Sequence, residues 1–443
     1  MYNLIGPNKE FRRFERKPYV KSFDYFVSLQ DASNEKKLNL KARAIDISDL
    51  GIGIETDYPL APGHELWING GIDKAGVVRW CLKLDNNYRA GIKLKKEKEN
   101  TSAYEYIEET ASFVAEERGK YTRLLDIATE QFNRRMEDIE KRCSDPQENP
   151  DEIFRAVTEA IDDMMNTCAE FERGIKDTDI IRQARTAFRE NTNPILAKSY
   201  FINRTRTWPQ GSQGDYKTLE SSYKNMPLSD GIGYHLDLFL LSSPLGIGVR
   251  NRIKILEGLL RDEIQKRSMP AVLNIACGSC RELIGVAPEI IDSKARVVCV
   301  DSDNDALAFA QSRLSYSGIT EEARFYKYNA LRLFDHEQSI AEFGKQDIIY
   351  SVGFFDYLPS DFLVKLFGSI YNMLNPGGKI IAAFKDARRY RSQEFHWLVD
   401  WDGFQQRHEE DFRNIMSDAG IPSHAMSETR DDSGAIIFYV ITR

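Results

Sequence analysis

Two cysteines, Cys277 and Cys280, lie three residues apart in the stretch NIACGSCRE, directly after an apolar run. Such a pair can bind a metal ion or undergo thiol chemistry. The small residues around the cysteines also suit a strand-to-helix turn that a ligand approaches closely. A zinc site needs about four ligands, and the sequence offers no second Cys/His pair at suitable spacing. We therefore predict a ligand-binding turn and no metal site.

The residues downstream of this turn favour a nucleotide-binding sheet. From Pro270 onward, helix-like segments alternate with short apolar runs, namely AVLNIA, RVVCVD, RFYKYN, DIIYSV and KIIAAF. This alternation predicts a mostly parallel, Rossmann-like α/β sheet with helices on both faces. The second run ends with Asp301, 23 residues after Gly278. A carboxylate at that position can accept hydrogen bonds from ribose hydroxyls.

From about residue 230 to the end, the sequence resembles class I S-adenosylmethionine-dependent methyltransferases, and the phosphate-binding G-x-G-x-x-G of dehydrogenases is absent. The resemblance implies S-adenosylmethionine as cofactor. The implied contacts, running from the methionine moiety through the ribose to the adenine, are Ala276, Gly278, Asp301, Ser302, Asn329 and Ala330. The family usually reads acidic-x-G-x-G-x-G at the turn, but here Asn274 takes the acidic place and Ala276 and Cys280 replace two glycines. A simple strand cap is the alternative role for Asn329.

A narrower resemblance concerns the substrate. The stretches RTWPQGSQGDYKTLESSY, ACGSCRE, GFFDYLP and DWDGFQQR are similar to a bacterial group labelled extracellular factor 3-hydroxypalmitic acid methyl ester biosynthesis proteins. That resemblance implies carboxyl O-methylation of a small or fatty-acid-like molecule. The catalytic candidates are two pairs, one from the matching G-D-Y segment and one after the fourth predicted strand: Asp215, Tyr216, Asp356 and Tyr357. Trp401 is a candidate roof of the substrate pocket, with simple packing as its alternative.

The chemistry of methyl transfer separates two classes of acceptor. Transfer from a sulfonium is an in-line displacement, so alignment supplies much of the acceleration. A carboxylate is already ionised at neutral pH and needs only a cation to hold it. The candidate cations are Arg250, Arg252, Arg388, Arg389 and Arg407. An alcohol or amine acceptor would need a general base, for which the candidates are Asp215, His235 and Asp356. The acceptor is expected to be a small or lipid-like molecule, and a protein acceptor stays open.

The N-terminal region carries a second set of residues with recognisable chemistry. RRFERKPY contains Arg12, Arg13 and Arg16, and DISDLGIG contains Asp46, Ser48 and Gly51. Guanidinium groups bind phosphates in a bidentate manner and stack on purines, and Asp or Ser can hydrogen-bond a guanine edge. The short, turn-bounded apolar runs between residues 10 and 98 predict a small β-barrel around them.

This pairing of R-x-x-x-R with D-x-S-x-x-G resembles the PilZ domain, a bacterial receptor for cyclic di-GMP. The resemblance implies that Arg12 and Arg16 clamp the nucleotide with help from Arg13, while Asp46 and Ser48 complete the pocket beside Gly51. Cyclic di-GMP would then be a regulatory ligand and partner. The alternative is a solvated basic arm next to an ordinary hairpin turn.

Length and charge limit the remaining possibilities. A chain of 443 residues is too long for one ordinary core. We predict a multidomain protein: a PilZ-like β-barrel over 10–98, an α-helical segment over 102–200 that could hold a homodimer, and a methyltransferase domain over 201–443, with 201–269 as its substrate or lid extension. The net charge of −8 argues against a nucleic-acid polymer as partner. We also expect no membrane span.

The expected function is a cytoplasmic methyltransferase regulated by cyclic di-GMP. Six scattered cysteines and the absence of a signal-peptide pattern favour the cytoplasm. The alternative is a non-catalytic signalling adaptor whose methyltransferase domain has degenerated, which the departures at the glycine-rich turn would explain.

Overall fold

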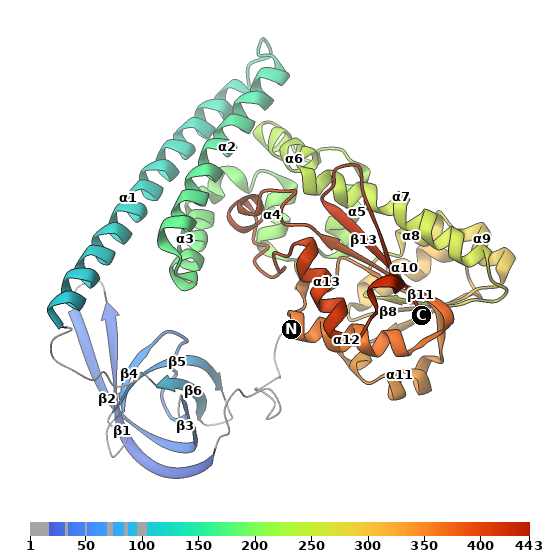
Figure 1. Cartoon of the computed structure of the whole chain (residues 1–443). Helices are drawn as coiled ribbons and strands as arrows, with labels where there is room; N and C mark the ends of the chain where they lie inside the picture. The colour runs from blue at the N-terminus through green and yellow to red at the C-terminus, as the bar shows by residue number, and fades with distance from the viewer. Residues whose placement is uncertain (1–16, 32–33, 49–50, 69–73, 84–86, 95–103) are drawn as a thin grey trace. The chain divides into compact units, whose positions relative to one another are not determined.

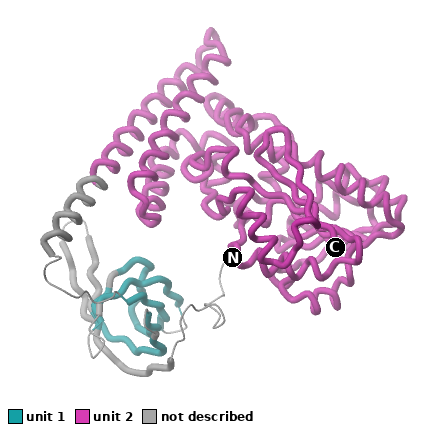
Figure 2. Tube along the Cα trace, viewed as in Figure 1, with its two compact units in different colours: residues 1–113 teal, residues 114–443 magenta. Residues whose placement is uncertain are grey.

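The computed structural model describes residues 17–31, 34–48, 51–68, 74–83, 87–94 and 104–443. The chain divides into two compact units, Met1–Phe113 and Val114–Arg443 (Figure 2). Each unit has a hydrophobic core of its own.

The first unit contains a closed antiparallel barrel in the strand order β1-β2-β3-β6-β5-β4 (Figure 1). Its strands are β1 (Lys17–Asp31), β2 (Asn34–Ser48), β3 (Gly51–Thr56), β4 (Glu65–Ile68), β5 (Lys74–Lys83) and β6 (Tyr88–Leu94). The barrel closes because β1 pairs with both β2 and β4 at Tyr25. Ile52, Ile54 and Ile92 fill the interior with other apolar side chains. The small barrel expected from the short apolar runs is thus present.

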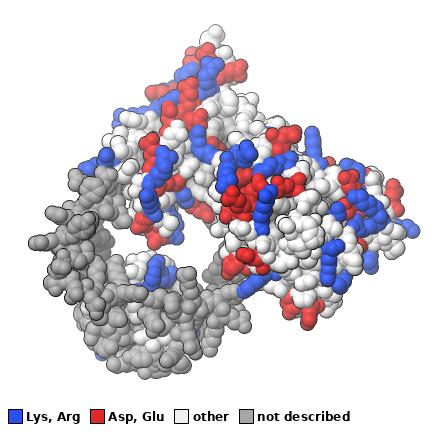
Figure 3. All heavy atoms as spheres, viewed as in Figure 1, with Lys and Arg blue, Asp and Glu red and all other residues white. Residues whose placement is uncertain are grey.

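Three long helices come next: α1 (Tyr104–Arg142), which belongs to the second unit from Val114 onward, α2 (Pro150–Ile175) and α3 (Thr178–Leu196). Helix α2 begins where Asn149 accepts a hydrogen bond from the Asp151 amide, with Pro150 at the first helical position, as expected for a helix start. Arg135 of α1 pairs with Glu159 and Asp163 of α2. Figure 3 shows acidic and basic side chains interspersed over these helices.

Helices α2 and α3 share a core with the C-terminal sheet. Trp397, from the segment after strand β11, is fully buried and packs edge-on against Phe171 of α2 and Phe188 of α3, with ring centroids 5.9 and 5.7 Å away. Its indole N–H donates to Glu172 at 2.9 Å, and Arg185 binds both Glu172 and Asp402. The helices and the sheet therefore form one packed body rather than two independent ones.

Four further helices connect α3 to the sheet: α4 (Tyr200–Thr207), α5 (Tyr216–Lys224), α6 (Ile232–Ser242) and α7 (Pro244–Gln265). Among the described residues, no single helix has both the length and the hydropathy of a membrane span. Helices α6 and α7 meet those criteria only together, with a bend of 59° at the break between them.

The C-terminal sheet has seven strands in the order β12-β13-β11-β10-β7-β8-β9. They are β7 (Ala271–Ile275), β8 (Arg296–Asp301), β9 (Ala323–Lys327), β10 (Gln346–Val352), β11 (Leu374–Lys385), β12 (Met426–Arg430) and β13 (Ile436–Thr442). Strands β7 to β11 are parallel, and β13 runs antiparallel to both of its neighbours. The Rossmann-like sheet expected from the alternating runs is therefore confirmed.

Helices cover both faces of this sheet (Figure 1). The covering elements are α8 (Arg281–Ile284), α9 (Ala287–Ser293), α10 (Asn304–Tyr316), α11 (His336–Phe343), α12 (Ser360–Asn372) and α13 (Glu409–Asp418). Successive strand residues point to opposite faces, so Ile348 belongs to the core on the α7 side and Ile349 to the core on the α12 side. This double burial explains why the strands read as continuous apolar runs.

The strand order places a topological switch point between β7 and β10. The chain passes from β7 outward to β8 and β9, and then returns to β10 on the other side of β7. In open α/β sheets, ligands bind outside the carboxyl ends of the strands at such a point. The site should therefore lie where β7, β8, β10 and β11 end.

Candidate active site

The turn after β7 has the conformation of a close-approach loop. Ala276, Gly278 and Cys280 all have positive φ, of 54°, 53° and 50°. Only glycine adopts this conformation without steric cost, which accounts for the glycines that the resemblance leads one to expect at this turn. Ala276 and Cys280 keep the backbone conformation although they replace glycines. The predicted strand-to-helix turn is present.

The space above Gly278 is open to a ligand. A side chain added at Gly278 would meet only the Cβ atom of Tyr216, 4.0 Å away. The Gly278 amide donates to Oδ2 of Asp301 at 2.8 Å. The backbone and a carboxylate thus line one small recess.

Asp301 ends β8, as predicted, and lies directly beside this turn. Its second oxygen, Oδ1, accepts a hydrogen bond from the Asp303 amide at 2.9 Å. Burial raises the pKa of this carboxyl, although two backbone amides favour the charged form. Ser302 follows it and is exposed. The carboxylate retains acceptor capacity for ribose hydroxyls, because each of its oxygens can accept more than one hydrogen bond.

Asn329 and Ala330 lie after the adjoining strand, at the same end of the sheet. The Tyr328 amide donates to the Asp301 carbonyl at 2.7 Å, which ties this segment to the end of β8. Asn329 is exposed, and its Oδ1 accepts from the Leu331 amide at 3.0 Å. It therefore caps the short 3₁₀ helix Ala330–Phe334. This capping role matches the simpler of the two alternatives for Asn329.

Asp215 and Tyr216 begin helix α5. Asp215 is buried and accepts hydrogen bonds from the backbone amides of Lys217 and Thr218, while its carboxylate pairs with Arg204 at 2.7 Å. The Thr218 hydroxyl donates to it as well, at 3.0 Å. The arrangement makes Asp215 the N-cap that orients Tyr216 over the Gly278 recess.

A buried ion pair lies at the ends of β10 and β11. Asp356 belongs to the short 3₁₀ helix Phe355–Tyr357 after β10, and Lys385 ends β11. The Lys385 ammonium lies 2.5 Å from Oδ2 of Asp356, and the Lys385 amide donates to Oδ1 at 3.1 Å. Burial lowers the pKa of Lys385, and the Asp356 carboxylate opposes that effect. The sequence reasoning missed Lys385, although a lysine closing an apolar strand was a usable signal.

Tyr357 belongs to the same cluster. The Lys385 ammonium lies 5.5 Å from the centre of its ring. A Cβ atom at Gly214 would lie 3.0 Å from the Tyr357 hydroxyl and 3.2 Å from the Trp401 ring. The G-D-Y segment before α5 is therefore packed against the segment after β10 and against Trp401, so the two predicted catalytic pairs lie in one region.

Arg252 of α7 contributes a second buried cation. Only 4% of its surface is exposed, and its guanidinium donates to the Tyr223 hydroxyl at 3.0 Å. A Cβ atom at Gly353, just beyond β10, would lie 3.3 Å from this guanidinium. Its Nε atom is buried without a partner. In the part of the chain that the structure describes, no carboxylate forms an ion pair with Arg252.

The other candidate cations are occupied or peripheral. Arg250 donates to the Leu241 carbonyl, Arg388 pairs with exposed Glu410, and Arg407 donates to the Leu358 carbonyl. Arg389 lies beside Gly434. His235 is buried on α6, and burial lowers its pKa.

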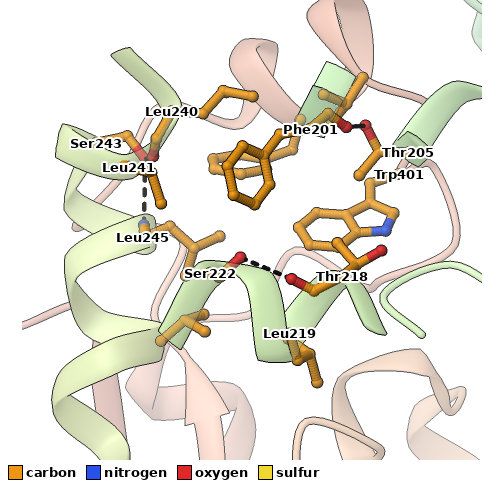
Figure 4. Close-up of a pocket in the computed structure, with 14 residues that line it drawn as sticks. Phe201, Thr205, Thr218, Leu219, Ser222, Leu240, Leu241, Ser243, Leu245 and Trp401 are labelled. Atoms are coloured by element: carbon orange, nitrogen blue, oxygen red, sulfur yellow. Dashed lines mark hydrogen bonds between the residues drawn. The ribbon is translucent and has the colours of Figure 1, made fainter. Parts of the chain in front are cut away.

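An apolar cavity opens on the α4–α7 side of this region (Figure 4). It encloses about 540 Å³ of space, its open mouth included, and Trp401 and Phe395 form one wall. The hydroxyls of Thr205 and Ser222 donate to backbone carbonyls of their own helices, so they add little polarity to the lining. The remaining lining is Phe201, Thr218, Leu219, Leu240, Leu241, Ser243, Leu245, Gly246, Val249 and Val399.

The predicted nucleotide-binding residues of the barrel are only partly described. Arg12, Arg13 and Arg16 lie outside the described residues. Asp46 and Ser48 lie on β2, where Ser48 pairs with Gly51 of β3 across the turn. The D-x-S-x-x-G motif therefore spans the β2–β3 connection of the barrel.

Comparison with known proteins agrees with the C-terminal geometry. Residues 272–378 match a protein-family model described as a methyltransferase domain. No curated protein matches the chain.

Solved structures resemble the chain weakly. One is described as a possible exported protein from Bordetella parapertussis: it has a TM-score of 0.43 and 14% identity, with 73% of this chain and 96% of that chain covered. Another is magnesium protoporphyrin IX methyltransferase from Synechocystis PCC 6803 with bound SAH. It has a TM-score of 0.35 and 14% identity, with 45% of this chain and 85% of that chain covered. A third is the N-methyltransferase NodS from Bradyrhizobium japonicum WM9. It has a TM-score of 0.30 and 14% identity, with 44% of this chain and 95% of that chain covered. At these scores the assignment depends on the family match.

The family match and the site geometry lead to the same assignment. The matched residues begin in β7, continue through the Gly278 recess and Asp301, and end within β11. The recess has the small residues, positive φ values and carboxylate that fit the cofactor implied by the sequence. The C-terminal part of this chain therefore contains a methyltransferase domain built on a Rossmann-like sheet.

Proposed function

We propose that this domain methylates the carboxylate of a small or fatty-acid-like acceptor, under control of cyclic di-GMP bound to the N-terminal barrel. When bound, S-adenosylmethionine supplies an electrophilic methyl group. The chain contributes the Gly278 recess and Asp301, which hold and orient the donor. Its remaining task is to align an acceptor oxygen with that methyl group and to keep water away.

The charge balance beside β10 carries this proposal. Lys385 and Arg252 supply two buried cations, and Asp356 supplies one buried anion that is already bound to Lys385. A buried charge without a partner is costly. An acceptor carboxylate bound to Arg252 would remove that cost, and the buried, unpartnered Nε atom is available for one of the hydrogen bonds.

The same cluster disfavours an acceptor that must be deprotonated. Asp356 is held by the ammonium and the amide of Lys385, and Asp215 caps α5 and pairs with Arg204. Neither carboxylate is placed to accept a proton from a substrate hydroxyl without giving up these bonds. A carboxylate acceptor needs no such base, because it is already ionised.

The apolar cavity supports an acceptor with a hydrocarbon part. Trp401 lines the cavity, and its ring also approaches Gly214 and thus the Tyr357 hydroxyl. A hydrocarbon chain in the cavity would pass this tryptophan to bring its polar end toward Tyr357. Burial of each methylene would contribute about 0.8 kcal/mol to binding.

Removing the positive charge of Arg252 tests the proposal. The Arg252→Gln variant should raise KM for a carboxylic acid acceptor by about tenfold to a hundredfold, the value of one or two charge-assisted hydrogen bonds. Binding of S-adenosylmethionine, measured by calorimetry, should not change. Transfer of labelled methyl to carboxylic acids of increasing chain length gives the rates.

Arg250→Gln is the matched control, because Arg250 lies only two residues earlier on α7 and donates to a backbone carbonyl. It should leave KM within about twofold of wild type, since surface or backbone-bound arginines contribute little to a distant site. Equal losses in both variants, or methyl transfer to alcohols but not to acids, would count against a carboxylate acceptor.

The regulatory part of the proposal depends on the motif pair and on the barrel that carries one half of it. Arg12→Ala and Arg16→Ala should each abolish cyclic di-GMP binding and leave S-adenosylmethionine binding intact. Arg43→Ala is the control, because Arg43 is an exposed barrel arginine that pairs with Glu55 at 2.9 Å. A similar loss of cyclic di-GMP binding in all three variants would show that the overall positive charge, and not the motif, binds the nucleotide. The adaptor alternative requires that no acceptor is methylated with or without cyclic di-GMP.

A further inference from the structure

Three buried cysteines meet beneath the cofactor turn. Cys277 and Cys280 come from the turn after β7, and Cys299 lies on β8, where it pairs with Asn274. Their sulfur atoms all lie within 4.8 Å of one another, and those of Cys280 and Cys299 are 3.6 Å apart. Cys299 is remote from the other two in sequence, and the pairing of β7 with β8 brings it to them; the expectation of no metal site was based on the first two cysteines alone.

The spacing of these sulfurs suits a common metal ligand set. Zinc-bound thiolates have Zn–S bonds of about 2.3 Å in tetrahedral geometry, which places ligand sulfurs about 3.8 Å apart. A disulfide would need sulfurs about 2.0 Å apart, and all three cysteines are free thiols. The observed separation therefore fits sulfurs around one ion better than a covalent bond.

An amide side chain lies beside these cysteines. The Nδ2 atom of Asn274 lies 3.8 Å from the Cys280 sulfur and also donates to Glu282 at 3.0 Å. Donors around a sulfur are the usual outer contacts that orient metal ligands.

We propose that Cys277, Cys280 and Cys299 form a binding site for one thiophilic d¹⁰ metal ion, which is either Zn²⁺ or Cu⁺. Each thiol that binds the ion releases one proton to solvent, and no electron is transferred. Three sulfurs complete the coordination of Cu⁺, whereas Zn²⁺ would take a fourth ligand from outside this trio. The bound ion would tie the turn after β7 to β8.

Metal titration of the full chain tests this site without donor or acceptor, so its outcome is independent of the proposed methyl transfer. Reduced, metal-free protein is titrated with Zn²⁺ against a chromophoric chelator, and anaerobically with Cu⁺ against a Cu⁺ chelator. We expect one equivalent of one of these ions to bind. The Cys299→Ala variant should lose that equivalent, whereas Cys168→Ala, at a buried cysteine of α2, should keep it.

A measurement on the wild type covers the case in which a variant fails to fold. In moderate urea, alkylation followed by mass spectrometry should show that the ion protects Cys277, Cys280 and Cys299 but leaves the rate at Cys168 unchanged. Equal protection of all four cysteines, binding that persists in Cys299→Ala, or recovery of a Cys280–Cys299 disulfide from reduced protein would each overturn the proposal.

Discussion

Under the proposed function, the candidate active site has a donor half and an acceptor half, and the two are built in different ways. The donor edge, formed by residues 276–280 and Asp301, relies on backbone conformation and backbone amides. The acceptor edge, formed by Arg252, Asp356, Tyr357 and Lys385, relies on buried charges from three separate elements. Under the proposed function, one sheet would hold the methyl donor by backbone shape and the acceptor by buried charge.

The largest expected effect concerns the acceptor edge. Lys385→Met should leave the Asp356 carboxylate buried without its cation, at 3% side-chain exposure. Removing one partner of a buried ion pair costs about 3–5 kcal/mol. We therefore expect a loss of that size in the free energy of unfolding, measured by urea denaturation.

The double variant Lys385→Met with Asp356→Leu separates charge from packing. It should recover most of the lost stability, because replacing a whole buried pair by apolar residues is often nearly neutral. If the double variant is as unstable as the single one, packing rather than charge governs the acceptor edge, and the contrast between the edges fails.

A smaller effect is expected at the donor edge. Asp301→Asn keeps an oxygen for the Gly278 amide but removes the charge that ribose hydroxyls would meet. Loss of charge-assisted hydrogen bonds should weaken S-adenosylmethionine binding by about a hundredfold, with little change in stability. Calorimetry measures the affinity, and Asp305→Asn, at an exposed residue of α10, is the control. Unchanged affinity would remove Asp301 from the donor edge.

The same contrast explains what could be predicted from the sequence. The donor edge lies within residues 274–301 and depends on residue types at fixed spacing, so the turn and Asp301 were placed correctly. Buried strands appear in the sequence as continuous apolar runs, and these runs predicted the sheet. The pairing of Lys385 could not be predicted from the sequence, because its partner Asp356 lies 29 residues away and only the register of β10 with β11 brings the two together.

Two other features could not be inferred from spacing. Trp397 packs between Phe171 and Phe188, which lie more than 200 residues earlier in the sequence, and no local sequence pattern predicts this contact. The contacts of Asp215 are the second feature. Its carboxylate caps α5 and pairs with Arg204, and the G-D-Y segment that made Asp215 a catalytic candidate does not show where the helix begins.

The smallest expected effect is a pH dependence from the segment after β11. Burial raises the pKa of Glu394 to about 7, with Arg391 opposing and Asp162 adding to the shift. Its Oε2 atom has no partner. Because the pKa is raised in the folded state, this contribution to stability is complete below about pH 4.5 and is lost as the pH rises through 7.

Glu394→Gln tests this charge and extends the contrast between the two edges. The variant should match wild type at pH 4 and exceed it at pH 8 by about 1–2 kcal/mol, less than the full value of the pKa shift because solvent reaches part of the group. Urea midpoints at the two pH values measure the difference. Glu394 precedes Phe395 of the cavity wall, so ionisation should also loosen the acceptor side while S-adenosylmethionine affinity stays constant. Parallel pH profiles for the two proteins would show that the carboxyl is solvated, and the acceptor edge would then owe its pH response to other groups.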